Sequence, residues 1–367
     1  MSANLQSSYT FPAIRGVQAG HEYYVSMCPL RIIPRIFAFD EEGELVPELR
    51  AQRVLNKARI PEIARYVLDN TQSYVFSALT ASIDGDVRFD AVGNAGESRN
   101  IGLLHVSMSS KFIINDGQHR RAAIEQAIRE NPDLADESIS VVFYVDAGLN
   151  RCQQMFADLN RHAIRPARSL GILYDQRDDL GSMTKLFVLK SPTFRDLVDM
   201  EKNSLSPRSR KLFTLSAFYS GNSVLLSRRE TLPPEEKYRL ASEFWEEVAQ
   251  HFPEWRFVRE RKMTSGDVRQ DFIHSHGIVL QALGHIGSAL IDRPDWKLLL
   301  KKLATIDWSR ANAKLWEGRA MQGGGVVKAR NNVVLTANAI KHVLGLDLNP
   351  DEQRVEDAHR RGDASNG

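Results

Sequence analysis

The chain has 367 residues in ordinary globular proportions, 43% hydrophobic, 26% charged and 8% aromatic, which excludes disordered, collagen-like and coiled-coil classes. At roughly 100–200 residues per domain, this length predicts two domains or one large one. The 48 Lys and Arg residues against 46 Asp and Glu residues leave a net charge of +2, which excludes a chain that is basic throughout but allows a local basic surface.

Strand and helix patterns alternate over residues 1–168, which predicts an α/β domain. The dipeptide Asp84-Gly85 predicts a hairpin turn between two strands. Runs of β-branched and aromatic residues predict strands, at 21–27, 30–39, 74–83, 86–90, 101–109, 111–115 and 138–146. Apolar residues at helical spacing predict helices, one beginning near Pro61 and others over about 118–129 and 150–160.

From about residue 170 the spacing of apolar residues becomes mainly helical, with breaks at prolines and at a run of glycines. The tail after Pro350 has little to bury, so we expect it to be disordered. We therefore predict an α+β protein with an α/β domain over 1–168, a mainly α-helical domain over 169–350 and a disordered tail over 351–367. The predicted helices of the second domain lie at 176–190, 211–220, 235–251, 273–291, 295–304 and 332–344.

The most informative stretch joins the strand ending at Ile114 to the helix that follows it. Gly117 allows a tight turn, and the unsatisfied N–H groups at a helix start attract anions. Arginines add charge and paired donors for a phosphate. In the competing interpretation Asp116 caps the helix and the arginines are solvated. The candidates for phosphate or nucleotide binding are Asn115, Gly117, Gln118, Arg120 and Arg121, and the candidates for catalysis are Asp116 and His119.

The string from Asp116 to Arg120, followed by a helix rich in small residues, resembles the signature of the DGQHR-domain family. That family is related to the ParB/sulfiredoxin-like fold, in which the corresponding strand, turn and helix bind nucleotide or phosphate. The segments at 154–178 and 331–340 resemble DndB proteins, which accompany bacterial DNA phosphorothioation genes and regulate that cluster by binding DNA. The resemblance covers about residues 20–345.

This resemblance implies an N-terminal ParB/sulfiredoxin-like domain and a repressor of a DNA phosphorothioate-modification gene cluster. It also implies that the partner is double-stranded DNA of the operon promoter. Sulfiredoxins carry a catalytic Cys where this chain has Gln118, so we do not expect sulfinic-acid reduction. ParB-type proteins have an acidic residue and two arginines in the turn, where this chain has residues 118–121. Phosphate binding can survive that difference, whereas cytidine nucleotide specificity is not carried over.

Two further stretches suit contacts with phosphate. Asn160 and Arg161 lie within the resembling segment at 154–178 and are candidates for the phosphate or nucleotide site, although a helix C-cap explains them equally well. Residues 202–229 contain no Asp or Glu, and a turn over 206–211 combines positive charge with hydroxyl donors before a helix, as DNA-backbone contacts do. Such basic runs are often only solvated. The DNA-binding candidates are Arg165, Arg168, Arg208, Arg210, Lys211, Arg228 and Arg229.

The cysteines, Cys28 and Cys152, are too few for a disulfide framework or a four-thiolate zinc site. Cys28 is a candidate redox thiol tuned by a nearby arginine, with a buried structural role as the alternative. The acids and histidines over 267–276 have a metal-like spacing but lack a His-Glu-x-x-His pattern, so we expect no metal site. The glycine run before Lys328 lacks the spacing of a phosphate-binding P-loop. Without a signal peptide or an apolar run of about 18 residues, we expect a cytoplasmic protein.

Three functions therefore compete. The first is the DNA-binding repressor. The second is a nucleotide-binding or nucleotide-hydrolysing enzyme that holds ATP or another nucleotide with Mg²⁺ at the DGQHR turn, and the third is a non-catalytic interaction subunit. A homodimer is expected, since DNA-binding regulators usually form two-fold oligomers.

Overall fold

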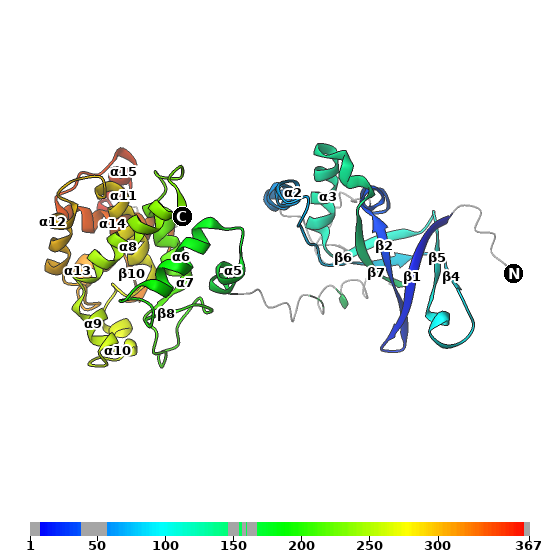
Figure 1. The fold of residues 1–367 in the computed structure, drawn as a ribbon, viewed down its shortest axis with the longest axis horizontal. Coiled ribbons are helices and arrows are strands. Elements are labelled where there is room, and N and C mark those ends of the chain that lie inside the picture. The colour runs from blue at the N-terminus through cyan, green and yellow to red at the C-terminus, as the bar shows by residue number, and fades with distance from the viewer. Residues whose placement is uncertain (1–7, 38–56, 146–153, 156–158, 160–166, 363–367) are drawn as a thin grey trace. The chain divides into compact units, whose positions relative to one another are not determined.

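The computed structural model describes residues 8–37, 57–145, 154–155, 159 and 167–362. The chain divides into two compact units, Met1–Ile164 (unit 1) and Arg165–Gly367 (unit 2), which we describe separately (Figure 1). Unit 1 contains a mixed sheet flanked by helices, and unit 2 is mainly helical. This arrangement confirms the α+β fold class.

The sheet of unit 1 has seven strands within the described residues, in the order β4-β5-β1-β2-β7-β3-β6. Neighbouring strands are antiparallel except β3 and β7, which are parallel. β1 and β2 form a tight hairpin through Ala19 and Gly20, which both have positive φ angles (51° and 78°), as a two-residue turn requires. The strands are β1 (Ser8–Gln18), β2 (His21–Pro29), β3 (Leu79–Asp84), β4 (Val87–Ala91), β5 (Ile101–Ser107), β6 (Lys111–Asp116) and β7 (Ser138–Val145).

The predicted hairpin at Asp84-Gly85 was wrong, because β3 and β4 do not pair with each other. They continue as one arm of a long ribbon whose other arm is β5 and β6, and Gly85 marks the bend between the two halves. A β-carbon at Gly85 would lie 2.2 Å from Ser110 Oγ, so only glycine fits this bend. Since β3 and β4 stand near opposite ends of the strand order, the bend also makes the sheet curl on itself.

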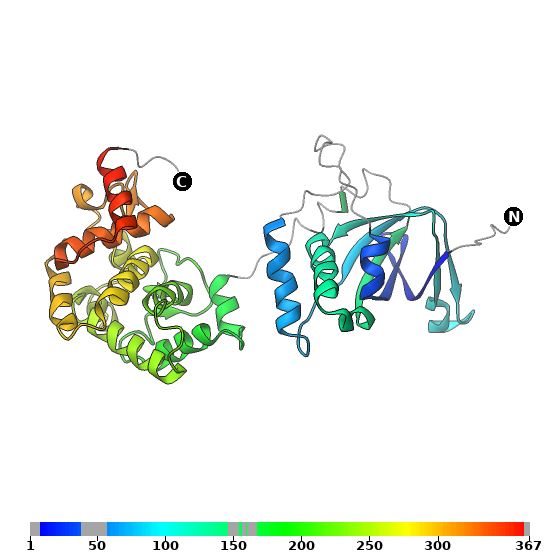
Figure 2. The same cartoon turned by 90° about the horizontal axis from the view of Figure 1, so that it is seen from above.

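The helices of unit 1 are α1 (Ile33–Ile36), α2 (Ile60–Asp69) and α3 (Gln118–Glu130), and α2 and α3 lie side by side (Figure 2). The predicted strand over 30–39 was wrong, since Leu30–Ile32 forms a 3₁₀ turn that leads into α1. Pro34 stands in the first turn of α1, where the missing N–H costs nothing. Ile33 and Ile36 are buried there, so an apolar run that reads as a strand is equally satisfied as a short helix.

Unit 2 is built from short and medium helices, with two small strand pairs, β8 (Val198–Asp199) with β9 (Phe213–Thr214) and β10 (Met321–Gln322) with β11 (Gly325–Val326). None of the helices in the described part of the chain is long and apolar enough to cross a membrane. The helices are α5 (Arg168–Tyr174), α6 (Asp179–Lys190), α7 (Leu215–Leu225), α8 (Pro234–Ala249), α9 (Pro253–Arg259), α10 (Ser265–Asp271), α11 (Gly277–Leu290), α12 (Trp296–Leu300), α13 (Ala313–Trp316), α14 (Arg330–Leu344) and α15 (Pro350–Arg360).

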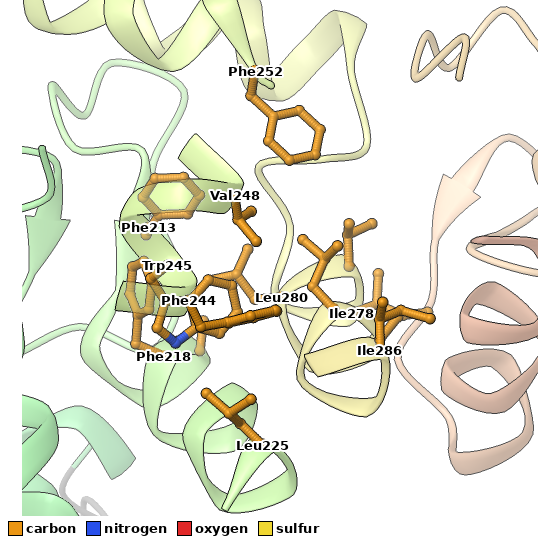
Figure 3. Packing of buried hydrophobic residues seen from close by; sticks show 14 of the residues in the cluster. Phe213, Phe218, Leu225, Phe244, Trp245, Val248, Phe252, Ile278, Leu280 and Ile286 are labelled. Carbon is orange, nitrogen blue, oxygen red and sulfur yellow. The ribbon is translucent and has the colours of Figure 1, made fainter. Parts of the chain in front are cut away.

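Helices α7 and α11 pack against each other at the centre of unit 2 through glycines. A β-carbon at Gly284 would lie 2.4 Å from the carbonyl oxygen of Gly221, so the two backbones approach closely. Further along, Gly287 of α11 faces Leu225 of α7. Because the contacts advance in the same direction along both helices, α7 and α11 are parallel and both begin at the same end. Aromatic side chains, among them Phe218, Phe244 and Trp245, fill the surrounding core (Figure 3).

The expectation of a disordered tail was wrong for residues 351–360, which form α15. Asn349 starts this helix with a capping box, in which its side chain accepts the N–H of Glu352 at 2.9 Å and the Glu352 carboxylate accepts the N–H of Asn349 at 2.9 Å. Ion pairs then replace the missing apolar contacts, since Lys341 pairs with Glu352 at 2.6 Å and Arg319 pairs with Glu356 at 2.5 Å. Residues 363–367 lie outside the described residues.

Candidate functional site

The DGQHR turn joins the edge strand β6 to α3 in unit 1. Gly117 has a left-handed backbone (φ 101°), and a β-carbon there would lie 2.4 Å from Leu79 Cδ2, so glycine is required. No side chain among the described residues caps the first turn of α3. The cap that the sequence allowed for Asp116 is therefore absent, and the first N–H groups of α3 keep their attraction for anions.

The arginines of the turn are bound to the protein itself. Arg120 pairs with Asp116 at 2.6 Å and also donates to the carbonyl oxygens of Ser77 and Ala78. The Arg121 side chain is only 9% exposed, and it donates to Glu125 and to the carbonyl oxygen of Pro34. Each arginine thus has a carboxylate partner on or beside α3, so the turn carries less uncompensated positive charge than the sequence predicts. The competing interpretation, in which both arginines are solvated, is wrong as well.

The polar residues beside the arginines are mostly buried. Asn115 is 2% exposed and donates to Ser82 Oγ at 2.7 Å, while its Oδ1 accepts no hydrogen bond from the residues that the structure describes. Gln118 is buried and donates to the carbonyl oxygen of Ile114, and His119 is half-buried. The other two residues predicted for this site, Asn160 and Arg161, lie outside the described residues.

A larger candidate site is a cavity of about 780 Å³ in unit 2, which we call the basic cavity. It is lined by the loop over 203–208, by the starts of α7, α10 and α11, and by side chains from two later loops. Asp267 is the single carboxylate that lines it among the described residues. The cationic side chains that line it are Arg168, Arg208, Arg269, Arg310 and Lys328.

Arg269 fixes the basic loop, by which we mean Lys202–Lys211. Its guanidinium donates to the carbonyl oxygens of Ser206 at 2.7 Å and Pro207 at 3.2 Å, and also to that of Lys211. The side chains of Arg208 and Arg210 are exposed, and neither guanidinium makes a hydrogen bond or ion pair with the described residues.

The starts of α7 and α11 both lie in the wall of the basic cavity. The first turn of α7 is capped, because Thr214 Oγ1 accepts the N–H of Ala217. The first turn of α11 has no side-chain cap, since the ring of His276 faces the carbonyl oxygen of Arg269 at 2.9 Å instead. Lys328 approaches this helix start closely, with Nζ 3.6 Å from the position that a β-carbon at Gly277 would take.

Positive charge predominates in the basic cavity, where, among the described residues, five cationic side chains face the single carboxylate of Asp267. Partial burial lowers the pKa of Lys328, and the positive charge of Arg168 lowers it further. Burial also lowers the pKa of His276. The hydrogen bond with the Arg269 carbonyl oxygen opposes this shift, and the positive charges of Arg310 and Arg269 lower the pKa further. Cations near the start of a helix oppose its dipole. The cavity is therefore suited to an anion, which all of these groups would favour.

The remaining DNA-binding candidates are divided. Lys211 donates to the carbonyl oxygen of Asp196 at 2.9 Å, and Arg228 is exposed beside a second cavity of about 570 Å³. Arg229 is buried and pairs with Asp292, so its charge is used within the fold. Arg165 lies outside the described residues.

The site residues that sequence reasoning missed are Arg269 and Arg310, and Lys328 was noted only for its glycine-rich neighbour. The sequence contains only a weak signal for these three residues. Each is a single cation in a different segment, and such residues are most often solvated. The start of α11 at His276-Gly277 was the best clue, because a helix start without a capping side chain seeks another partner.

The redox and metal candidates have structural explanations. Cys28 is fully buried, and burial raises the pKa of its thiol to about 11, which opposes thiolate chemistry. His274 is buried, and its Nδ1 accepts the indole N–H of Trp255 at 3.0 Å. No group of three or more metal-ligating side chains gathers within the described residues.

Comparison with known proteins gives one match. The family model DndB, described as DNA-sulfur modification-associated, matches residues 11–347. No curated protein and no solved structure matches the chain. The likeness of unit 1 to ParB/sulfiredoxin-like domains therefore stays a prediction.

Proposed function

The chain belongs to the DndB family of DNA-sulfur modification-associated proteins, and from that premise we propose that it is a DNA-binding repressor of a DNA phosphorothioate-modification gene cluster. Its partner is the double-stranded promoter DNA of that cluster. The observation that carries the proposal is the basic cavity together with the exposed arginines of the basic loop.

The basic loop has the features of a DNA-backbone contact. Arg208 and Arg210 are exposed and have no carboxylate partner in the described residues, so their charge is available to phosphates. Because Arg269 holds the backbone of the loop, little ordering entropy is lost when the arginines bind. Serine and threonine hydroxyls and helix starts next to the loop supply further donors for phosphate oxygens.

The direct test is fluorescence anisotropy of full-length protein with a promoter duplex, over 50–200 mM salt. The double variant R208A/R210A should weaken binding and reduce the slope of log K against log salt by about 2, since each lost phosphate contact contributes about 0.9. The matched control R239A/R256A removes two exposed arginines from α8 and α9, and should leave the slope unchanged. An unchanged slope in R208A/R210A removes the basic loop from the proposal.

Nucleotide binding at the DGQHR turn is a second candidate function, favoured by the uncapped start of α3 and the unpartnered Oδ1 of Asn115. The first N–H groups of α3 would hold a phosphate of ATP or another nucleotide. Asp116 would hold Mg²⁺ only after leaving Arg120, and His119 would contact the phosphate. Isothermal titration with ATP, CTP and GTP, with and without Mg²⁺, tests this function. A protein that binds neither nucleotide nor DNA would instead be a non-catalytic interaction subunit.

A further inference from the structure

We propose that the basic cavity contains a phosphate subsite, formed by the start of α11, the hydroxyl of Ser275 and the ammonium of Lys328, which binds one phosphate group. The subsite belongs to unit 2, whereas the DGQHR turn belongs to unit 1. Its assignment to a DNA phosphate rests on the proposed function, whereas phosphate binding as such does not.

The backbone at the start of α11 offers two donors. Gly277 and Ile278 are the first residues of a 14-residue helix, and their N–H groups make no hydrogen bond to the described residues. The dipole of α11 places about half a positive charge at this end. Because α7 is parallel to α11 and begins at the same end, its dipole adds to the positive potential although its own first turn is capped.

Ser275 supplies an independent observation. The residue is 4% exposed and lines the basic cavity, yet its hydroxyl has no hydrogen-bond partner among the described residues. Leaving a buried hydroxyl without a hydrogen-bond partner is unfavourable. A phosphate oxygen in the cavity would accept a hydrogen bond from this hydroxyl and so give it a partner.

Lys328 supplies the charge. Its ammonium lies 3.6 Å from the β-carbon position of Gly277, and it makes no ion pair with the described residues. The β10–β11 hairpin that precedes Lys328 is itself fixed, since Glu317 accepts the N–H groups of Gly323 and Gly324. The ammonium of Lys328 and the positive end of the α11 dipole repel each other. An anion bound between them would be attracted by both.

The chemistry of these donors selects phosphate. Two backbone N–H groups, one hydroxyl and one ammonium provide donors for three or more oxygens, which suits a tetrahedral oxyanion. Arg168 and Arg310 in the same cavity balance a charge of up to −2, as a phosphate monoester carries. The group can come from a DNA backbone or from a free nucleotide, which share this chemistry.

Calorimetric titration of the full chain with sodium phosphate tests the subsite. We expect wild-type protein to bind phosphate, K328Q to bind it at least tenfold more weakly, and S275A to bind it several-fold more weakly. The matched control is R330A, which removes an exposed cation that lines the other cavity and should bind phosphate like the wild type. Circular dichroism of each variant checks the fold. Absence of phosphate binding by the wild type, or equal affinity in K328Q, overturns the proposal.

Two further arms identify the source of the phosphate. If DNA supplies it, K328Q loses DNA affinity and phosphate displaces the duplex. If a nucleotide supplies it, K328Q loses AMP binding while its DNA affinity equals that of the wild type. Both results support the subsite. DNA binding without phosphate binding overturns the subsite and leaves the proposed function standing. Phosphate binding without DNA binding supports the subsite and overturns the proposed function.

Discussion

Arg120 Nη2 lies 2.6 Å from Asp116 Oδ2, so two charged residues of the DGQHR string are paired with each other. The same guanidinium donates to the carbonyl oxygens of Ser77 and Ala78, just before β3. Arg120 therefore connects the turn to the segment that leads into β3 and acts as a structural residue.

We expect R120A to lower the free energy of unfolding of unit 1 by roughly 2–4 kcal/mol, because hydrogen bonds to a charged group contribute about 1.5–3 kcal/mol each. Urea denaturation measures the loss. The control R129A removes an exposed arginine from the other end of α3 and should change stability by no more than about 0.5 kcal/mol. If R120A is as stable as the wild type but binds nucleotide more weakly, Arg120 is a ligand residue instead.

Arg269 should protect the basic loop from proteolysis. Its guanidinium binds the carbonyl oxygens of Ser206, Pro207 and Lys211, so R269A frees the backbone on either side of Arg208. We expect trypsin to cleave after Arg208 and Arg210 several-fold faster in R269A, as mass spectrometry of timed digests would record.

The control for this experiment is R310A. Arg310 lines the same cavity but donates to the carbonyl oxygens of Gln270 and Gly324, outside the loop. Its substitution should leave cleavage at Arg208 unchanged. Equal cleavage rates in R269A and the wild type would show that the loop is held by other contacts.

Unit 2 should lose stability in mild acid. Burial lowers the pKa of His274, with a smaller opposing effect from Glu254, and burial also lowers the pKa of His276 and His285. These rings are neutral in the folded protein and take up protons more readily when it unfolds. Their contribution to stability is therefore complete above the unfolded pKa of about 6.5 and is lost as the pH falls below it.

Thermal denaturation at pH 7.5 and pH 5.5 tests this dependence, with a fall of about 2–4 °C for each kcal/mol lost. The variant H274N should be less stable than the wild type at pH 7.5. Its melting temperature should fall by less than that of the wild type between pH 7.5 and pH 5.5. The control H21Q changes an exposed histidine of unit 1 and should show the same fall in melting temperature between the two pH values as the wild type. A melting temperature that is higher at pH 5.5 than at pH 7.5 would contradict the predicted loss of stability in acid.

Removing α15 should destabilise unit 2. Truncation after Asn349 removes the partners of Lys341 and Arg319, two largely buried cations. Breaking a buried ion pair costs about 3–5 kcal/mol, so we expect the melting temperature to fall by at least about 6 °C. Truncation after Gly362 is the control and should have no effect. Equal melting temperatures would mean that α15 is dispensable.

Local features of the fold were predictable where one segment contains the whole signal. The starts of α2 and α3 follow from apolar spacing, and Gly117 was recognised as a turn residue that glycine must occupy. By contrast, Asp84-Gly85 has the composition of a hairpin turn, yet long-range pairing with β5 and β6 makes it a bend. The capping box of α15 is a local signal, but the ion pairs that hold the helix join residues far apart in the sequence.

The candidate site was only partly predictable for the same reason. Arg208 stands in an acid-free stretch that marks the basic loop, whereas Arg269, Arg310 and Lys328 come from separate segments. The fold of unit 2 brings them to one cavity beside the starts of α7 and α11, and composition contains no trace of that arrangement. The missing partner of Ser275 is likewise a property of the folded protein alone.

The close glycine contact between α7 and α11 allows substitutions far from the basic cavity to change its shape. Every substitution of a glycine adds a side chain, and at Gly284 its first atom would meet the backbone of Gly221. The two helices would then separate, although neither glycine is among the described residues that line the basic cavity. Natural variation at these positions is thus constrained by the geometry of a site some distance away, and a random-mutagenesis screen for lost binding should recover such glycines alongside the cations.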